Sequence, residues 1–167
     1  MSTKKVCCFT GHRPKHLPWR QYEVGETFLA FKFRLEKVIE KAILKGYNYF
    51  ISGMAQGIDL LAAEMVMHLK TTYSHIKLEC AIPFNGQKES FNSSDKLRYN
   101  NICKQADKLS VLAQTYSPDC LMKRNKYMVD KSSKVIACYL YIRGGTYNTI
   151  KYAMQKGVEV EIVKILE

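Results

Sequence analysis

Three glycine-rich segments carry the residues of this sequence that are best suited to chemistry on a phosphate-bearing ligand. They are TGHRP at residues 10–14, SGMAQGID at 52–59 and RGGTYNT at 143–149. Glycine lets the backbone approach a ligand closely and present N–H groups to an anion, and hydroxyl, imidazole and guanidinium groups donate hydrogen bonds to phosphate oxygens. The candidate ligand-binding residues in these segments are Thr10, Gly11, His12, Arg13, Ser52, Gly53, Met54, Ala55, Gln56, Asp59, Gly144, Gly145, Thr146 and Thr149.

Each segment also has a purely structural interpretation. The connection that contains Gly53 can simply let a helix pack closely on a sheet, and His12 and Arg13 can belong to a turn closed by the following proline. The spacing of the glycines matches neither a P-loop nor the dinucleotide-binding fingerprint. Several such loops that follow parallel strands meet at one edge of the sheet. We therefore expect Gly11, Gly53 and Gly145 to line one cleft.

A fourth segment, MKRNKYMV at residues 122–129, begins a predicted helix with several cations near its N-terminus. Helices prefer acidic residues at that end because of the macrodipole, so this arrangement favours the arrival of an anion. Lys123 and Lys126 have the alternative of being solvated, whereas the guanidinium of Arg124 can pair with phosphate through two hydrogen bonds. Arg124 and its neighbour Asn125 are therefore further candidate ligand-binding residues.

The elements that must position these residues follow from the hydrophobic pattern. Short apolar, β-rich segments alternate with longer segments of helical period, which predicts an α/β fold, a three-layer Rossmann-like parallel sheet flanked by helices. The expected strands cover residues 5–10, 47–52, 76–82, 108–112, 134–141 and 159–165. The expected helices cover residues 28–43, 58–70, 94–106, 121–132 and 148–156.

Composition limits the class of protein. The chain has 167 residues, 47% of them hydrophobic and 25% charged, and we expect a single domain over residues 1–167. The formal net charge of +11 favours encounter with polyanions, but the basic residues are spread along the chain and also suit a solvated surface. No apolar run is long enough for a signal peptide or a membrane span, so we expect a cytoplasmic location and no membrane partner.

Cysteine and histidine usage gives no sign of a metal site. Cys7, Cys8, Cys80 and Cys138 lie in apolar, strand-like runs, which predicts buried, reduced thiols. The histidines lack metal-ligand spacing and no CxxC pair is present, so we expect no metal, and no cofactor is indicated.

Taken as an ordered set, the motifs resemble those of the SLOG superfamily, a Rossmann-like group that contains the LOG-type phosphoribohydrolases and the DNA-processing protein A family. The resemblance is greatest to the bacterial YpsA-like family, whose GHRP, SGMA-GID, central P…Q…Y, RN-YMVD and GGT motifs are met nearly throughout between Phe9 and Ala153. The resemblance implies the same fold and places Arg124 where the LOG-type enzymes have their catalytic arginine. Gly144, Gly145 and Thr149 take the places of the phosphate-binding loop.

One departure from the LOG-type pattern bears on catalysis. Those enzymes carry a glutamate shortly after the loop threonine, and a carboxylate there supports cleavage of an N-glycosidic bond, whereas Lys151 stands in that stretch here. The candidate catalytic residues are therefore Arg124 and a substitute carboxylate, Asp59 or Glu64. Asp59 has the alternative role of a helix N-cap, and Glu64 that of a solvated or ion-paired residue.

Three functions are consistent with these features. The leading hypothesis is binding or sensing of a nucleotide or nucleotide-derived signal, a purpose that the resemblance implies. The alternatives are a nucleotide N-glycosidic hydrolase and a single-stranded DNA-binding protein; the net charge favours DNA, but no aromatic cluster is interleaved with a basic run. We also expect a homo-oligomer, because Phe31 and Phe33 lie about 200° apart on a helix, which leaves one of them for a partner.

Overall fold

Six parallel strands form the central layer of the protein in the computed structural model, which describes residues 3–166. The strands are β1 (Val6–Gly11), β2 (Tyr49–Ser52), β3 (Lys77–Ile82), β4 (Lys108–Val111), β5 (Lys134–Tyr139) and β6 (Glu159–Lys164). They lie in the order β4-β3-β2-β1-β5-β6, and every neighbouring pair is parallel. The predicted α/β, Rossmann-like architecture is therefore confirmed.

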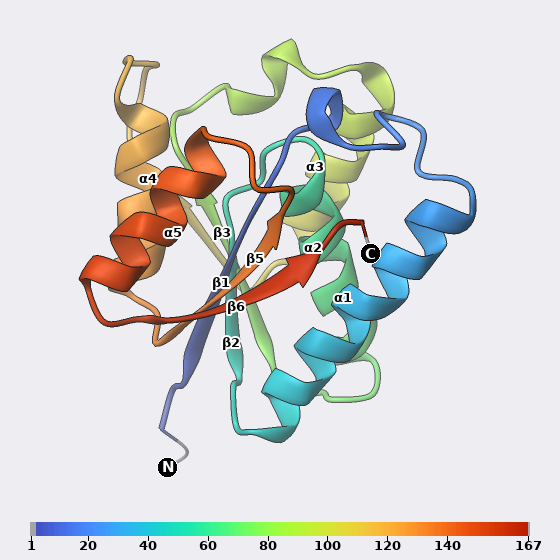
Figure 1. Ribbon diagram of the computed structural model, residues 1–167. Coiled ribbons are helices and arrows are strands. Elements are labelled where there is room, and N and C mark those ends of the chain that lie inside the picture. Colours follow the sequence, from blue (N-terminus) through green and yellow to red (C-terminus); the bar gives the residue numbers. More distant parts are fainter. Residues whose placement is uncertain (1–2, 167) are drawn as a thin grey trace.

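Helices cover both faces of the sheet (Figure 1). The first face carries α1 (Glu26–Leu44), α2 (Ile58–Lys70) and α3 (Ser93–Gln105), and the second carries α4 (Cys120–Asp130) and α5 (Gly145–Gln155). Two short 3-10 helices, η1 (Pro14–His16) and η2 (Gln87–Ser90), belong to loops after β1 and β3. None of the helices within residues 3–166 has both the length and the apolar character that a membrane span requires.

The core divides into two apolar layers because the sheet separates the helices. On the α1 side, Phe31 and Leu35 of α1 pack in one cluster with Phe9 and Phe50 of the sheet. The regular spacing of apolar residues along α1 turns one face of the helix towards the sheet. A smaller cluster on the other side contains Val129 of α4 together with residues of β1, β2 and β5. The six cysteines, all of them within the described residues, are free, and only Cys103 is not buried.

The chain reverses its direction of travel across the sheet at β1. From β1 it proceeds through β2 and β3 to the edge strand β4, and it then returns to place β5 on the other side of β1. Open parallel sheets bind ligands at such a switch point, beyond the carboxyl ends of the strands, because the loops after the two central strands diverge there. The loops after β1 and β5 are two of the glycine-rich segments.

The start of α5 differs from the sequence-based expectation. The helix begins at Gly145 instead of residue 148, with Gly144 as its N-cap at φ 151°. Helical pairing starts there, since Asn148 N–H donates to Gly144 O at 2.9 Å. Thr146 therefore belongs to the first helical turn and not to a loop.

Candidate functional site

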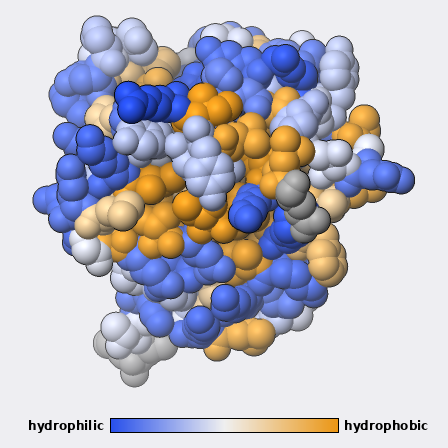
Figure 2. Space-filling model, viewed as in Figure 1, coloured by the Kyte–Doolittle hydropathy of each residue, from blue (hydrophilic) through white to orange (hydrophobic). Residues whose placement is uncertain are grey.

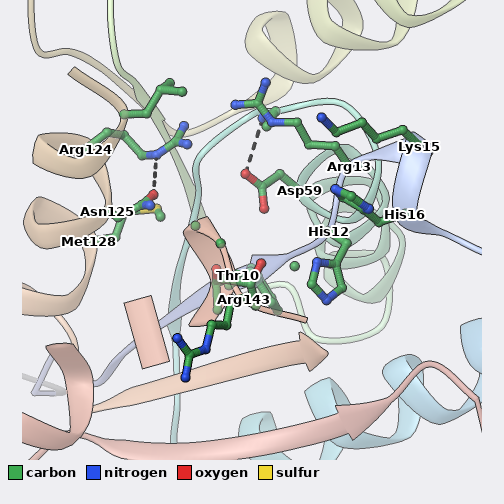
Figure 3. Close-up of a pocket in the computed structure, with 17 residues that line it drawn as sticks. Thr10, His12, Arg13, Lys15, His16, Asp59, Arg124, Asn125, Met128 and Arg143 are labelled. Carbon is green, nitrogen blue, oxygen red and sulfur yellow. Dashed lines mark hydrogen bonds between the residues drawn. The ribbon is translucent and has the colours of Figure 1, made fainter. Parts of the chain in front are cut away.

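A cavity of about 380 Å³ opens at the switch point, between the carboxyl ends of β1 and β5 and the N-terminal parts of α2, α4 and α5. Its volume is within the range of small-molecule sites. Figure 3 shows Arg124 and Asn125 of α4 on one side of it, with His12, Arg13 and Asp59 facing them. The predicted site residues that line it are Thr10, Gly11, His12, Arg13, Ala55, Asp59, Arg124, Asn125, Gly144, Gly145 and Thr146.

Six other lining residues were not among the sequence-based candidates: Phe9, Lys15, His16, Leu121, Met128 and Arg143. Lys15 and His16 belong to η1, in the loop that follows β1. Arg143 immediately precedes the Gly144 N-cap of α5. All three are close in sequence to a glycine-rich segment, and this proximity could have marked them as candidates. The sequence alone does not show which neighbours of such a segment line the cavity.

Arg124 is the most deeply buried cation of the cavity, with 4% of its surface exposed. Its Nη1 donates to the carbonyl of Gly53, and its Nε donates to Asn125 Oδ1 at 2.8 Å. Burial lowers the pKa of the Arg124 guanidinium, and the nearby carboxylate of Asp59 opposes that shift. Within the described residues, these hydrogen bonds leave Nη2 and the second N–H of Nη1 for a ligand.

The helix that carries Arg124 is fixed one turn further along by a buried carboxylate. Tyr127 Oη donates to Glu79 Oε2 at 2.6 Å, and Tyr49 and Ser110 donate to the same carboxylate at 2.5 and 2.9 Å. Three strands are thus linked to α4 through Glu79. Although burial alone raises the pKa of Glu79, these hydrogen bonds bring it below its usual value. This network limits the rotation of α4 and so helps to orient Arg124.

Asp59 is the carboxylate of the cavity, and 6% of its surface is exposed. It lies in the first turn of α2, and its Oδ2 accepts a hydrogen bond from Ala55 N–H at 3.3 Å. Burial raises the pKa of Asp59, while Arg124 and Arg13 lower it. The side chain of Asp59 therefore both shapes the loop before α2 and presents a polar group to the cavity.

His12 joins the two central loops. Its Nε2 accepts a hydrogen bond from Leu140 N–H at 3.0 Å, and its ring stacks on Tyr139 at a centroid distance of 5.6 Å. Burial lowers the pKa of His12, and the neighbouring His16 lowers it further. An acceptor nitrogen is a property of neutral imidazole, so in this arrangement His12 is uncharged and holds the loop after β5.

Five predicted ligand-binding residues do not line the cavity: Ser52, Gly53, Met54, Gln56 and Thr149. Ser52 Oγ accepts from Met54 N–H at 3.2 Å and donates to Asp59 O at 2.8 Å, which closes the loop after β2. Gln56 instead donates to Asp95 on α3, at 2.7 Å. Thr149 Oγ1 donates to Gly145 O at 2.8 Å inside α5. These side chains shape the surrounding backbone.

The expectation that Gly53 lines the cleft directly is wrong. The carbonyl of Gly53 accepts the hydrogen bond from Arg124 Nη1, and Arg124 is the residue that lines the cavity.

Glu64 is also outside the cavity, and its candidacy as a substitute carboxylate is corrected. It lies on α2 beyond the first turn, where it pairs with Arg98 of α3 at 2.5 Å. Lys151 is likewise not a cavity residue, because it is exposed on α5 two positions after Thr149, which is buried against the rest of the protein. At 100° per residue, two positions turn a side chain to the opposite face of a helix. Neither side chain lines the cavity.

The charge of the lining determines what the cavity can hold. Among the described residues, the lining contains four arginines and lysines, namely Arg13, Lys15, Arg124 and Arg143, and one carboxylate, that of Asp59. The N-terminus of α5 also lines the cavity, and it has no side-chain cap and no acidic residue in its first turn. Free backbone N–H groups and the helix dipole both favour an anion at such a position. The arrangement is suited to phosphate.

A family model matches most of the chain, namely that of the YspA SLOG family, over residues 7–165. The SPbeta prophage-derived protein YoqJ of Bacillus subtilis is 34% identical in a match of 140 residues that covers 76% of this chain and 82% of YoqJ.

Two solved structures share the fold at low sequence identity. DNA processing protein A (DprA) of Helicobacter pylori, described by its single-stranded DNA binding mode, has a TM-score of 0.64 at 15% identity, over 96% of this chain and 65% of that one. DprA of Streptococcus pneumoniae has a TM-score of 0.60 at 20% identity, over 95% of this chain and 50% of that one. The chain thus spans only part of each DprA.

Proposed function

The chain belongs to the YspA SLOG family, and from that premise we propose that it binds a nucleotide or nucleotide-derived signal by its phosphate in the cavity at the switch point. The observation that carries the proposal is the lining of the cavity, where four arginine and lysine residues and the uncapped N-terminus of α5 surround a single carboxylate. Arg124 supplies the fixed guanidinium and Arg13, Lys15 and Arg143 the exposed cations.

The parts of the ligand follow from the groups around the cavity. We place the phosphate between Arg124 and the first turn of α5, because Arg124, Gly145 and Thr146 all line the cavity and a helix N-terminus favours an anion. Asp59 is an acceptor in the same cavity and suits the hydroxyl groups of a ribose. The six free cysteines suit a reducing compartment, so the ligand we propose is a cytoplasmic one.

Two experiments test the proposal together. Protein purified from its host is denatured by heat, and the released small molecules are identified by mass spectrometry. Calorimetry with a panel of nucleoside monophosphates then measures affinity in the wild type and in Arg124→Ala. The proposal predicts a phosphorylated ligand whose affinity depends on Arg124; a preparation that releases none, and that binds none of the panel, would exclude it.

Hydrolysis of an N-glycosidic bond is a second candidate function, and Asp59 is the observation that favours it. Its carboxyl group is buried beside Arg124, and burial raises its pKa, a combination that is frequent among catalytic acids and bases. The LOG-type glutamate has no counterpart in the cavity. We therefore rank binding above turnover.

Single-stranded DNA binding is a third candidate, favoured by the DprA structures and by the net charge of +11. A DNA strand would need a continuous path with stacked bases beyond the cavity. Electrophoretic mobility shift with an oligonucleotide, with and without competing nucleoside monophosphate, separates this function from the first. A shift that Arg124→Ala leaves unchanged would assign DNA to another surface.

Self-association is part of the same proposal, since a partner copy would cover apolar surface on the outside of α1. Phe31 is fully buried, whereas 60% of the surface of Phe33 is exposed on the outer face of the helix. Figure 2 shows that apolar residues also gather near the middle of the face viewed in Figure 1, where β6 lies in front and α1 lies beside it. Exposed apolar area of this kind favours association.

A further inference from the structure

The central P…Q…Y motif lies outside the cavity, yet its glutamine and tyrosine are buried. Gln87, the first residue of η2, has 6% of its surface exposed, and so has Tyr99 of α3. Neither residue lines the cavity. Their hydrogen bonds nevertheless lead directly to it.

The hydrogen bonds form a short relay from α3 to the loop after β2. Tyr99 Oη donates to Gln87 Oε1 at 3.0 Å, and Gln87 Nε2 donates to Gly53 O at 3.1 Å. Because the tyrosine hydroxyl occupies the amide oxygen of Gln87, the amide nitrogen is directed at Gly53. The orientation of the glutamine amide is thus set by Tyr99.

The carbonyl of Gly53 also accepts the hydrogen bond from Arg124 Nη1. A carbonyl oxygen has two lone pairs, and here one is used by Gln87 and the other by Arg124. Fixing the carbonyl from one side therefore fixes the point to which the guanidinium is attached on the other. Gly53 lacks a side chain, so the guanidinium can pack directly on its backbone.

We propose that Gln87 and Tyr99 are positioning residues for Arg124: through the Gly53 carbonyl they hold its guanidinium in the direction in which it meets the phosphate of the ligand. The proposal rests on the proposed function for the ligand, but the positioning of Arg124 is measurable without one. Neither residue touches the ligand, and both act through Arg124.

Gln87→Glu is the sharpest test because it changes one atom of the relay. The carboxylate no longer donates to Gly53 O, and its charge attracts the guanidinium of Arg124 away from the cavity. The matched control is Gln105→Glu, which makes the same change on an exposed glutamine of α3 that donates to Asn101 at 2.8 Å. Tyr99→Phe, which removes a single hydroxyl, is the second variant if Gln87→Glu does not fold.

Two readouts separate positioning from general stability. The first is the ¹⁵N–¹H resonance of Arg124 Nε in the free protein, assigned by its loss in Arg124→Lys. The second is the dissociation constant for adenosine 5′-monophosphate, measured by calorimetry. We expect Gln87→Glu to shift the resonance and to weaken binding roughly tenfold or more, and Tyr99→Phe to weaken it roughly threefold, with Gln105→Glu like the wild type.

The outcomes are distinct for the two proposals. If the Arg124 resonance and the affinity are unchanged in folded Gln87→Glu and Tyr99→Phe, the relay is overturned, even where the variants unfold at lower temperature. If the wild type binds no nucleoside monophosphate, the proposed function fails, and the resonance alone then decides whether Gln87 and Tyr99 position Arg124.

Discussion

A Cβ atom on Gly53 would lie 2.6 Å from Nη1 of Arg124 and 2.9 Å from its Nε. Real Cβ atoms do not approach other atoms so closely, so the glycine after β2 is what allows the guanidinium to rest on the backbone there. Gly11, after β1, is equally crowded, but its neighbour is the side chain of Ile58 in the core. Gly53 thus makes room for the guanidinium of Arg124, and Gly11 makes room for the side chain of Ile58 on α2.

Gly53→Ala should therefore mainly weaken ligand binding, whereas Gly11→Ala should mainly lower the stability of the fold. The guanidinium is the movable end of a long side chain, so Gly53→Ala displaces it, weakens nucleotide binding by about 1–2 kcal/mol and costs less than about 1 kcal/mol of stability. Gly11→Ala presses on a branched core residue and destabilises the fold by about 1–3 kcal/mol. Denaturant unfolding and calorimetry on both variants measure the contrast, and equal stability losses would contradict it.

Arg124→Ala should weaken binding of a phosphorylated ligand by about 1.5–3 kcal/mol, the range for a hydrogen bond to a charged group. The control is Lys123→Ala, which removes an adjacent cation whose side chain is 71% exposed and paired with Asp119. Calorimetry at one salt concentration should show a near-normal affinity for the control. Unchanged affinity in a folded Arg124→Ala would remove Arg124 from the site.

The stability of the protein should fall as the pH is lowered through about 6.5, the ordinary pKa of histidine. Folding lowers the pKa of His12, so below about pH 6.5 the unfolded chain takes up a proton that the folded chain resists, with a slope of at most about 1.4 kcal/mol per pH unit. His12→Gln keeps an acceptor for Leu140 N–H but does not titrate. Its free energy of unfolding should depend less on pH between 7.5 and 5.5, and parallel curves for the two proteins would refute the assignment.

Common nucleoside monophosphates should be bound without appreciable release of free base. The cavity lacks the LOG-type glutamate, and the loss of one stabilising group typically costs on the order of 100- to 1000-fold in rate. Chromatography for free base measures this directly. Turnover within the usual enzymatic range of roughly 1–1000 per second would make the protein a hydrolase; Asp59→Asn should then abolish turnover, and Glu64→Gln, outside the cavity, should not.

Light scattering should give the mass of a dimer for the wild type at high concentration. Phe33→Glu places a charge on the exposed apolar face of α1 and should shift the mass towards that of a monomer. Leu44→Glu, at the exposed C-terminal end of the same helix, is the matched control. Monomer mass for the wild type would rule out this mode of association.

Much of the fold was determined by the sequence itself. Apolar residues at three- and four-residue spacing and continuous apolar runs are local signals, and they predicted all six strands and five helices to within a few residues. The order of the motifs along the chain also located the loops at the carboxyl edge, since parallel strands must all end there. Arg124 was singled out because helix N-termini prefer acidic residues, whereas the segment that contains Arg124 begins a helix with several cations.

Only the tertiary structure decided which of these residues face the cavity. Glu64 and Gln56 had chemistry suited to a ligand, but Arg98 and Asp95 of α3 hold them on another surface. Conversely, Gln87 reaches Gly53 over 34 positions of the chain. Side-chain direction depends on partners brought together by folding, and a contact between distant segments leaves no periodic trace in the sequence. Local pattern therefore specified the elements, while long-range packing selected the site.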